Sequence, residues 1–406
     1  MRNLRSEGVL QEMTTKTQVG IIGSGPAGLL LSQLLHVNGI ESVVLEKHSR
    51  AYVEGRIRAG ILEGGTVRML EDAGVADRLH KESLIHQGVG IHFEDKLHRI
   101  DFHELTEGKS MTVYGQSELT KDLMDAHADR DQNPVYEASD VRISGVEDNK
   151  STLTYIAEEK EHSVQCEFVV GCDGYHGVSR DYFPKTLLKT YEKIYPFGWL
   201  GVLADVPPVD DELIYNNHPD GFALASQRSK TRSRYYLQCD SREEVGDWSD
   251  ERFWEVLIHR FGENIGSRIT TGPSIEKSIA PLRSFVAEPM RYKSLFIAGD
   301  AAHILPPTGA KGLNLAASDI HYLSEALIRF YKTGDSDGLD HYSDVALDRV
   351  WKAVRFSWWF THLTHRFPEN EGDGLPYKLQ KAEFDYIASS RAASTSLAEN
   401  YVGLPY

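Results

Sequence analysis

The sequence is poor in cysteine and in positive charge. Only Cys166, Cys172 and Cys239 occur among 406 residues. They are too few for a disulfide framework and are not spaced as a metal-binding cluster, so a reducing compartment is expected. The 44 basic residues are outnumbered by 60 acidic ones, which gives a formal net charge of −16. This charge repels nucleic acid and anionic membrane surfaces and argues against either as a partner.

No segment has the pattern of a membrane span or a signal peptide. The longest apolar stretch, residues 19–35, is interrupted by glycines and by Pro26, which is typical of strand, turn and helix in succession. Residues 1–15 are polar and charged, so we expect a disordered leader and a cytoplasmic protein. With 406 residues, 41% of them hydrophobic, the chain is expected to form more than one subdomain.

A glycine-rich turn near the start predicts a dinucleotide site. Gly23, Gly25 and Gly28 follow a short apolar strand pattern and precede a helical pattern over residues 29–37. In this context the first glycine permits a tight turn, the second lets the backbone approach a pyrophosphate, and the third lets helix and strand pack closely. A second predicted strand ends at Glu46, which is placed to meet a ribose hydroxyl. The motif alone does not separate FAD from NAD.

Two further turns favour a flavin nucleotide. One buried strand pattern ends shortly before Asp173 and another ends at Asp300. Each aspartate alone is more often a turn residue or a helix cap, but three such turns in this order are not needed by a nicotinamide dehydrogenase. A proline pair then stiffens a loop, and a helix is predicted to begin near Gly312. Its first N–H groups and positive dipole end suit an electron-rich group.

Longer segments carry a resemblance to one enzyme family. Beyond the three turns, the similarity extends from about Lys16 to the C-terminus and is most specific at residues 56–60, 113–116, 195–200, 226–228, 278–285 and 399–406. These segments resemble the class A FAD-dependent aromatic hydroxylases, which are single-component flavoprotein monooxygenases. The resemblance implies a mixed α/β fold. It comprises a Rossmann-like FAD-binding domain (16–187 and 290–335), a mixed-sheet substrate domain (188–289) and a C-terminal helical and interface region (336–406).

The resemblance implies hydroxylation of 4-hydroxybenzoate at its 3-position to 3,4-dihydroxybenzoate. The expected reaction uses NAD(P)H and dioxygen through a C4a-hydroperoxide of the flavin. Arg228 can bind a carboxylate bidentately while Ser226 and Tyr236 donate to it, and by resemblance these three form the substrate clamp. Without the resemblance, a solvated strand arginine would be the favoured interpretation of Arg228.

At the hydroxyl end of the substrate, the resemblance assigns Tyr215 as the partner of the phenol. Tyr401 and His86 would continue a proton relay, and the carbonyl group of Pro307 would contact the same hydroxyl. A relay is needed because a phenol has a pKa of about 10, whereas the ring is attacked as the phenolate. The alternative for both tyrosines is packing with satisfied hydroxyl groups. No metal is expected.

The resemblance also assigns residues to two nucleotide cofactors. The residues expected to contact FAD are Gly23, Gly25, Gly28, Glu46, Arg56, Arg58, Gln116, Asp173, Asp300, Gly312, Leu313 and Asn314. Those expected to contact the nicotinamide coenzyme are Lys47, His48, Arg58, His176, Arg180 and Arg283. The basic segment 47–52 favours NADPH because Lys47 or Arg50 could bind a 2′-phosphate, with NADH as the alternative.

Other functions and the assembly state stay open at this point. The same chemistry on 3,4-dihydroxybenzoate or 4-aminobenzoate is one alternative; a flavin-binding sensor and a nicotinamide dehydrogenase are others. The C-terminal helices are rich in aromatic residues, some of which are expected in the interface of a homodimer. The alternative for these residues is the core of a single chain.

Overall fold

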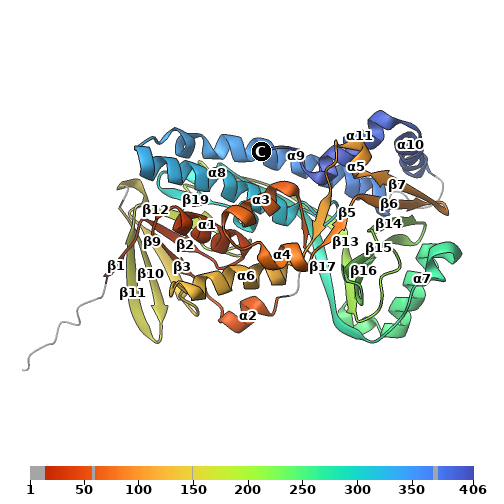
Figure 1. Cartoon of the computed structure of the whole chain (residues 1–406), viewed down its shortest axis with the longest axis horizontal. Coiled ribbons are helices and arrows are strands. Elements are labelled where there is room, and N and C mark those ends of the chain that lie inside the picture. Colours follow the sequence, from red (N-terminus) through yellow and green to blue (C-terminus); the bar gives the residue numbers. More distant parts are fainter. Residues whose placement is uncertain (1–13, 57–59, 149, 369–373) are drawn as a thin grey trace, which may run out of the picture.

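The computed structural model describes residues 14–56, 60–148, 150–368 and 374–406. Figure 1 shows an elongated molecule with long helices along one side. Arg58 lies outside the described residues, and so does most of the expected leader. The last two leader positions, 14 and 15, belong to the first strand, β1 (Thr14–Lys16).

A five-stranded, mostly parallel sheet contains the strands that were predicted before the three turns. Its order is β18-β19-β12-β2-β3, and only β18 and β19 pair antiparallel. All residues of β2, β12 and β19 are buried, as expected for parallel strands covered on both faces. The strands are β2 (Val19–Ile22), β3 (Ser42–Leu45), β12 (Phe168–Gly171), β18 (Arg291–Tyr292) and β19 (Leu295–Ile297).

An eight-stranded sheet forms the other large part of the molecule. Its order is β20-β17-β13-β16-β15-β14-β6-β7, and two long antiparallel strands, β13 and β17, run through it. The strands are β6 (Gly88–Phe93), β7 (Lys96–Asp101), β13 (Lys189–Ala204), β14 (Ile214–His218), β15 (Gly221–Ser229), β16 (Arg232–Asp240), β17 (Ser274–Glu288) and β20 (His303–Ile304). Because β6 pairs with β14, residues 88–101 belong to this sheet, although they fall inside the range predicted for the FAD-binding domain.

Two smaller sheets complete the strands of the described chain. In the first, β1 pairs with β11 (Lys160–Cys166), followed by β10 (Ser151–Ala157) and β9 (Ser139–Ser144). In the second, β8 (Met111–Val113) lies between β4 (Ile61–Leu62) and β5 (Leu84–His86). The second sheet supplies His86.

Helices cover the five-stranded sheet and connect it with the eight-stranded one. The helix α1 contacts both α6 and α8, and α9 packs along α8 and reaches β14 and β17. The helices are α1 (Pro26–Val37), α2 (Arg50–Glu54), α3 (Gly64–Asp72), α4 (Asp77–Glu82), α5 (Phe102–Leu105), α6 (Gln116–Asp129), α7 (Asp250–Gly266), α8 (Gly312–Thr333), α9 (Asp337–Thr364), α10 (Leu375–Ser389) and α11 (Arg391–Val402). The described part of the chain also contains four 3-10 turns: η1 (Val146–Asp148), η2 (Ser179–Tyr182), η3 (Val245–Asp247) and η4 (Gly299–Ala301).

The predicted α/β class is confirmed. A helix begins at Gly312, as predicted, and the described part of the C-terminal region contains α9, α10 and α11. The three cysteines are free, and two of them are buried. Among the described helices, none combines the length and the apolar character needed to cross a bilayer.

Candidate active site

The glycine-rich turn between β2 and α1 has two closely packed glycines and one open one. Gly23 has a φ of +105°, and a Cβ there would lie 2.3 Å from the carbonyl oxygen of Cys172. A Cβ on Gly28 would lie 2.0 Å from the carbonyl oxygen of Gly23. A Cβ on Gly25 would meet no atom within 4 Å. Two glycines therefore close the turn, and the third leaves room for a ligand to approach the backbone.

Glu46 follows β3 and turns its carboxylate toward this glycine-rich turn. The buried carboxylate accepts hydrogen bonds from the N–H (2.9 Å) and the hydroxyl group (3.0 Å) of Ser24 and from the N–H of His48 (2.9 Å). A carboxylate has about four lone-pair sites, so Glu46 can still accept a bond from a ribose hydroxyl.

The other two predicted turns are tied together by Arg180. Asp173 accepts hydrogen bonds from the N–H (2.9 Å) and hydroxyl group (2.8 Å) of Ser179, and its buried Oδ1 has no hydrogen-bond partner within the described chain. Burial raises the pKa of Asp173, against the opposing effect of Ser179. Arg180 donates to the carbonyl oxygen of Ala301 (2.7 Å), next to the half-buried Asp300 in η4. The two turns therefore lie side by side.

The N-terminus of α8 offers the second open backbone of the site. A Cβ on Gly312 would meet no atom within 4 Å, and Leu313 beside it is half-buried. The first N–H groups of a helix lack partners inside the helix and carry its positive dipole end. Open backbone at Gly25 and at Gly312 suits the diphosphate and the electron-rich ring of FAD, respectively.

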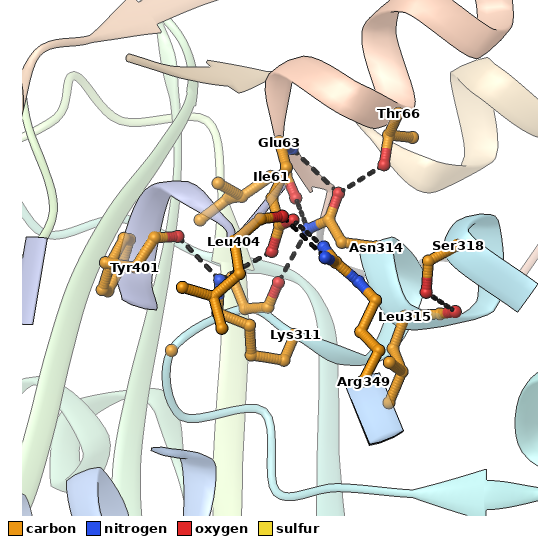
Figure 2. Close-up of polar contacts among 12 residues, drawn as sticks. Ile61, Glu63, Thr66, Lys311, Asn314, Leu315, Ser318, Arg349, Tyr401 and Leu404 are labelled. Atoms are coloured by element: carbon orange, nitrogen blue, oxygen red, sulfur yellow. Dashed lines mark hydrogen bonds and ion pairs between the residues drawn. The ribbon is translucent and has the colours of Figure 1, made fainter. Parts of the chain in front are cut away.

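The Asn314 side chain is fully engaged by the protein (Figure 2). Its Oδ1 accepts hydrogen bonds from the N–H of Glu63 and the hydroxyl group of Thr66, and its Nδ2 donates to the carbonyl oxygens of Ile61 and Ala310, all at 2.8 Å. These four bonds use the two donors and two acceptor lone pairs of an amide. A contact of Asn314 with the flavin ring is therefore expected from its backbone N–H.

Glu63 bridges two buried cations next to this helix start (Figure 2). Its carboxylate accepts hydrogen bonds from Lys311 (2.6 Å) and from Arg349 (3.0 Å). Lys311 also donates to the carbonyl oxygen of Tyr401 (2.7 Å), and Arg349 donates to that of Leu404 (2.6 Å). Burial lowers the pKa of Lys311, while Glu63 opposes that shift. The cluster joins the start of α8 to the C-terminal segment that carries Tyr401.

Arg228 is a largely buried cation with no carboxylate partner among the described residues. Its guanidinium group donates to the carbonyl oxygen of the preceding residue (3.1 Å) and makes long contacts with the hydroxyl groups of Ser226 (3.4 Å) and Tyr236 (3.5 Å). Burial lowers the pKa of Arg228. The neighbouring Arg234, by contrast, pairs with Glu276. The structure thus brings the three predicted clamp residues together around an uncompensated charge.

Tyr215 and Tyr401 form a buried hydroxyl pair. The two hydroxyl oxygens lie 2.9 Å apart, and the N–H of Gly309 donates to Tyr215 at 3.4 Å. Burial raises the pKa of Tyr215 to about 12, although its two hydrogen-bond partners lower it. Burial and the neighbouring Tyr215 raise the pKa of Tyr401 as well. Both side chains are therefore neutral hydroxyl groups near pH 7.

His86 is buried on β5, where its contact is Gln227. The Nε2 atom of His86 lies 2.7 Å from the amide nitrogen of Gln227, whereas the hydroxyl partner of Tyr401 is Tyr215. Burial, with a smaller contribution from Arg228, lowers the pKa of His86 to about 4. A relay step from Tyr401 to His86 stays a prediction.

Two more predicted contacts lie beside the site. The carbonyl group of Pro307 accepts a hydrogen bond from the N–H of Ala310 (3.0 Å) and keeps a second lone pair for a ligand. Gln116 is the first residue of α6. A Cβ on Gly60 would lie 2.6 Å from the backbone nitrogen of Gln116. The backbones of Gly60 and Gln116 thus approach closely, and the ligand contacts stay predictions.

The residues predicted for the nicotinamide coenzyme form two groups. In the first, His176, Arg180 and Arg283 surround the ring of Tyr175, with Arg283 4.5 Å from its centroid. This aromatic and cationic surface is suited to a planar, negatively charged nucleotide.

The second group lies around α2. His48 stacks on Tyr52 with ring centroids 4.0 Å apart, and Arg56 lies 5.9 Å from the same ring. Lys47 is exposed, whereas Arg50 pairs with two carboxylates. Of the two cations that favoured NADPH in the sequence, only Lys47 lacks an ion-pair partner among the described residues.

Sequence reasoning missed several polar residues that organise the site. Asp319 on α8 is fully buried and accepts hydrogen bonds from the N–H of Gly299 (2.8 Å) and from His303 (2.6 Å). Although burial lowers the pKa of His303, Asp319 raises it overall. Asp319 was detectable as a charged residue on the apolar face of the predicted helix. Glu63 and Arg349 had no comparable signal.

Residues 16–357 match the sequence family described as FAD binding domain. The chain belongs to this FAD-binding family. It is 57% identical over 393 residues to the p-hydroxybenzoate hydroxylase of Acinetobacter baylyi, covering 97% of this chain and 96% of that protein. It is 22% identical to the kynurenine 3-monooxygenase of Candida albicans, covering 84% and 82% of the two chains.

A solved member of the same fold is the p-nitrophenol 4-monooxygenase of Pseudomonas putida. That structure superposes with a TM-score of 0.79 at 21% identity and covers 97% of this chain and all (100%) of its own. The predictions of a flavoprotein monooxygenase and of FAD as its cofactor are confirmed. Membership of the family accounts for the FAD cofactor and its chemistry. The choice of substrate depends on the site residues of this chain.

The aromatic C-terminal helices divide into core and surface. Phe356 and Phe360 are buried within the chain, whereas Trp351 and Trp358 are 38% and 44% exposed. The intramolecular alternative therefore holds for the two phenylalanines.

Among the described residues, one group of possible metal ligands lies elsewhere on the surface. His218, Asp220 and His259 have ligand atoms within 4.8 Å of one another. Asp220 already contacts His259 at 2.9 Å, and the group lies among exposed or half-buried residues, so we assign it no role.

Proposed function

We propose that the protein hydroxylates 4-hydroxybenzoate at the position ortho to its phenol and releases 3,4-dihydroxybenzoate. The observation that carries this proposal is the uncompensated charge of Arg228, framed by Ser226 and Tyr236. A carboxylate would neutralise this charge with bidentate geometry. The Tyr215–Tyr401 pair supports a phenolic group at the other end of the same substrate.

FAD, once reduced by the nicotinamide coenzyme, supplies the activation of dioxygen. The protein residues hold the ring and move its proton. Since the pKa of Tyr215 is raised to about 12, Tyr215 does not act as a base at neutral pH. We propose that it accepts the substrate proton as its own hydroxyl proton passes to Tyr401 and the hydroxyl proton of Tyr401 passes on toward His86, so no charged tyrosine accumulates. The carbonyl group of Pro307 would hold the substrate hydroxyl at the start of this path.

We propose NADPH as the preferred coenzyme, with NADH as the alternative. Exposed Lys47 supports contact with a 2′-phosphate, while the engagement of Arg50 by two carboxylates weakens that support. Initial rates with the two coenzymes at equal concentration test this choice, and faster turnover with NADH would contradict it.

The product assay tests the proposed function directly. The FAD-loaded protein is mixed with NADPH or NADH in air, with and without 4-hydroxybenzoate, and the products are separated by chromatography. We expect 3,4-dihydroxybenzoate only with 4-hydroxybenzoate present. Parallel reactions contain 4-aminobenzoate, 3,4-dihydroxybenzoate, or phenol as a matched substrate without the carboxylate. No hydroxylated product from 4-hydroxybenzoate with either coenzyme would contradict the proposal.

We also propose a cytoplasmic homodimer. The exposed Trp351 and Trp358 support an interface because large exposed aromatic side chains are enriched where subunits meet. Sedimentation analysis tests the assembly. A monomer at micromolar concentration would contradict it.

A further inference from the structure

Gln227 links the strand of the substrate clamp to His86. It lies between Ser226 and Arg228 in β15, at a register shift in the pairing with β16. Such irregularities redirect side chains. The buried amide donates to the carbonyl oxygen of Asp211, and the same nitrogen lies 2.7 Å from Nε2 of His86.

The two contacts of this amide fix the protonation of the imidazole. A carbonyl oxygen only accepts hydrogen bonds, so the Gln227 amide must present its nitrogen to Asp211. The second hydrogen of the same NH₂ group then points to His86, whose Nε2 must be an acceptor. The ring hydrogen of neutral His86 therefore lies on Nδ1. If the amide were flipped, its oxygen would face the carbonyl oxygen of Asp211, and two acceptors would be in an unfavourable contact.

This arrangement opposes a second proton on the ring. A cationic His86 carries hydrogens on both nitrogens. Its Nε2–H would then face the NH₂ group of Gln227, and two donors would repel each other. The neutral ring meanwhile carries a donor at Nδ1, which has no hydrogen-bond partner among the described residues, whereas a residue that receives the substrate proton must offer an acceptor.

We propose that Gln227 is a positioning residue that holds His86 neutral and protonated on Nδ1, so that His86 receives a proton from the relay only when the amide contact opens. This proposal rests on the proposed function only in making His86 a member of the relay. Because Gln227 is adjacent to both clamp residues, a movement of β15 on substrate binding would also change the distance between Gln227 and His86.

The charged groups around His86 partly oppose one another. Arg228 disfavours a cationic ring, whereas Glu212, Asp211 and Asp210 favour one. The acidic groups surround His86 whether or not the amide is present. Removing the amide therefore leaves their effect intact and exposes the contribution of Gln227.

Nitrogen NMR of the full FAD-loaded protein with labelled histidine tests the proposal. The ring signals of His86, assigned by comparison with His86→Asn, report both the tautomer and its titration. We expect the Nδ1–H tautomer in the unaltered protein. In Gln227→Met we expect the pKa of His86 to rise by about one pH unit, a tenfold change in proton affinity, as one hydrogen bond is lost. Gln227→Glu should raise it further, because a carboxylate accepts from Nε2–H.

The matched control is Gln238→Met, which removes a glutamine on the adjacent strand that contacts the carbonyl oxygen of Arg366. It should leave the titration of His86 unchanged. An Nε2–H tautomer in the unaltered protein, or equal His86 titrations in the two Met variants, overturns the proposal. If Gln227→Met fails to retain FAD, Gln227→Glu and the tautomer of the unaltered protein decide the question. None of these readouts needs turnover, so they stand apart from the product assay.

Discussion

Replacement of Arg228 by glutamine should weaken substrate binding and at the same time stabilise the substrate-free protein. Arg228 is largely buried and has no acidic partner within the described chain. A substrate carboxylate would receive two charged hydrogen bonds of about 1.5–3 kcal/mol each. Glutamine keeps one neutral donor worth about 1 kcal/mol. The net loss is about 2–5 kcal/mol, which corresponds to a dissociation constant about 30- to 4,000-fold higher.

The stability change has the opposite sign because a buried charge without a partner is costly. Relief of that cost should raise the free energy of unfolding of the substrate-free protein by about 1–2 kcal/mol. Thermal unfolding would then shift upward by a few degrees, roughly 1–4 °C. Few substitutions in a binding site are expected to combine lower affinity with higher stability, so the pair of signs is a specific signature.

Calorimetric titration of the FAD-loaded protein with 4-hydroxybenzoate measures the affinity. The matched control is Arg232→Gln in the same hairpin, where an exposed arginine pairs with Asp205 at 2.7 Å and contributes little. A phenol without a carboxylate should bind both variants equally. The reasoning is refuted if Arg228→Gln weakens 4-hydroxybenzoate no more than Arg232→Gln does, or if it lowers the unfolding temperature.

Three further predictions concern the hydroxyl pair, the buried ion cluster and acid stability. Tyr401→Phe removes the hydroxyl partner of Tyr215 and should lower the hydroxylation rate by about 10²–10⁴-fold with little change in substrate affinity, measured by steady-state kinetics. Glu63→Gln leaves two buried cations without their shared carboxylate and should cost about 3–5 kcal/mol in chemical denaturation; an unchanged midpoint would contradict this. His365 is buried and its pKa is lowered to about 3. Below pH 6.5 the unfolded state takes up the proton of His365 first, so His365 alone should lower the free energy of unfolding by about 1.4 kcal/mol per pH unit down to about pH 3. His365→Phe should reduce that slope.

Local sequence patterns were enough to predict the strands, turns and helix starts that are expected to bind the dinucleotide. The requirements at Gly23, Gly25 and Gly28 are set within a few residues of chain, by a turn and the packing of one helix on one strand. The strand before Asp300 and the helix at Gly312 follow likewise from short apolar periods. Residues 88–101 belong to the eight-stranded sheet and not to the predicted FAD-binding domain. This was missed because an alternating pattern predicts a strand but not the strand with which it pairs.

The polar network around the N-terminus of α8 depends on contacts that no local pattern contains. Glu63 meets Lys311 and Arg349 across 248 and 286 positions of sequence, and each alone resembles a surface charge. Asn314 was predicted to contact the flavin ring, yet four protein bonds occupy its side chain. Its role can only be inferred once its neighbours are known, since an amide that has used its donors and acceptors cannot bind a ligand.

Gln227 is a further residue whose contacts follow from the fold and not from the local sequence. The sequence places Gln227 between two clamp residues, where strand alternation predicts only that it faces away from them. That this opposite face holds His86 and a backbone carbonyl is a consequence of how β5 and the loop at Asp211 pack. In the proposed function, the clamp strand would thereby contact the substrate on one side and the proton relay on the other. A substitution at Gln227 therefore separates these two roles, because it alters the relay while leaving the charge that binds the carboxylate in place.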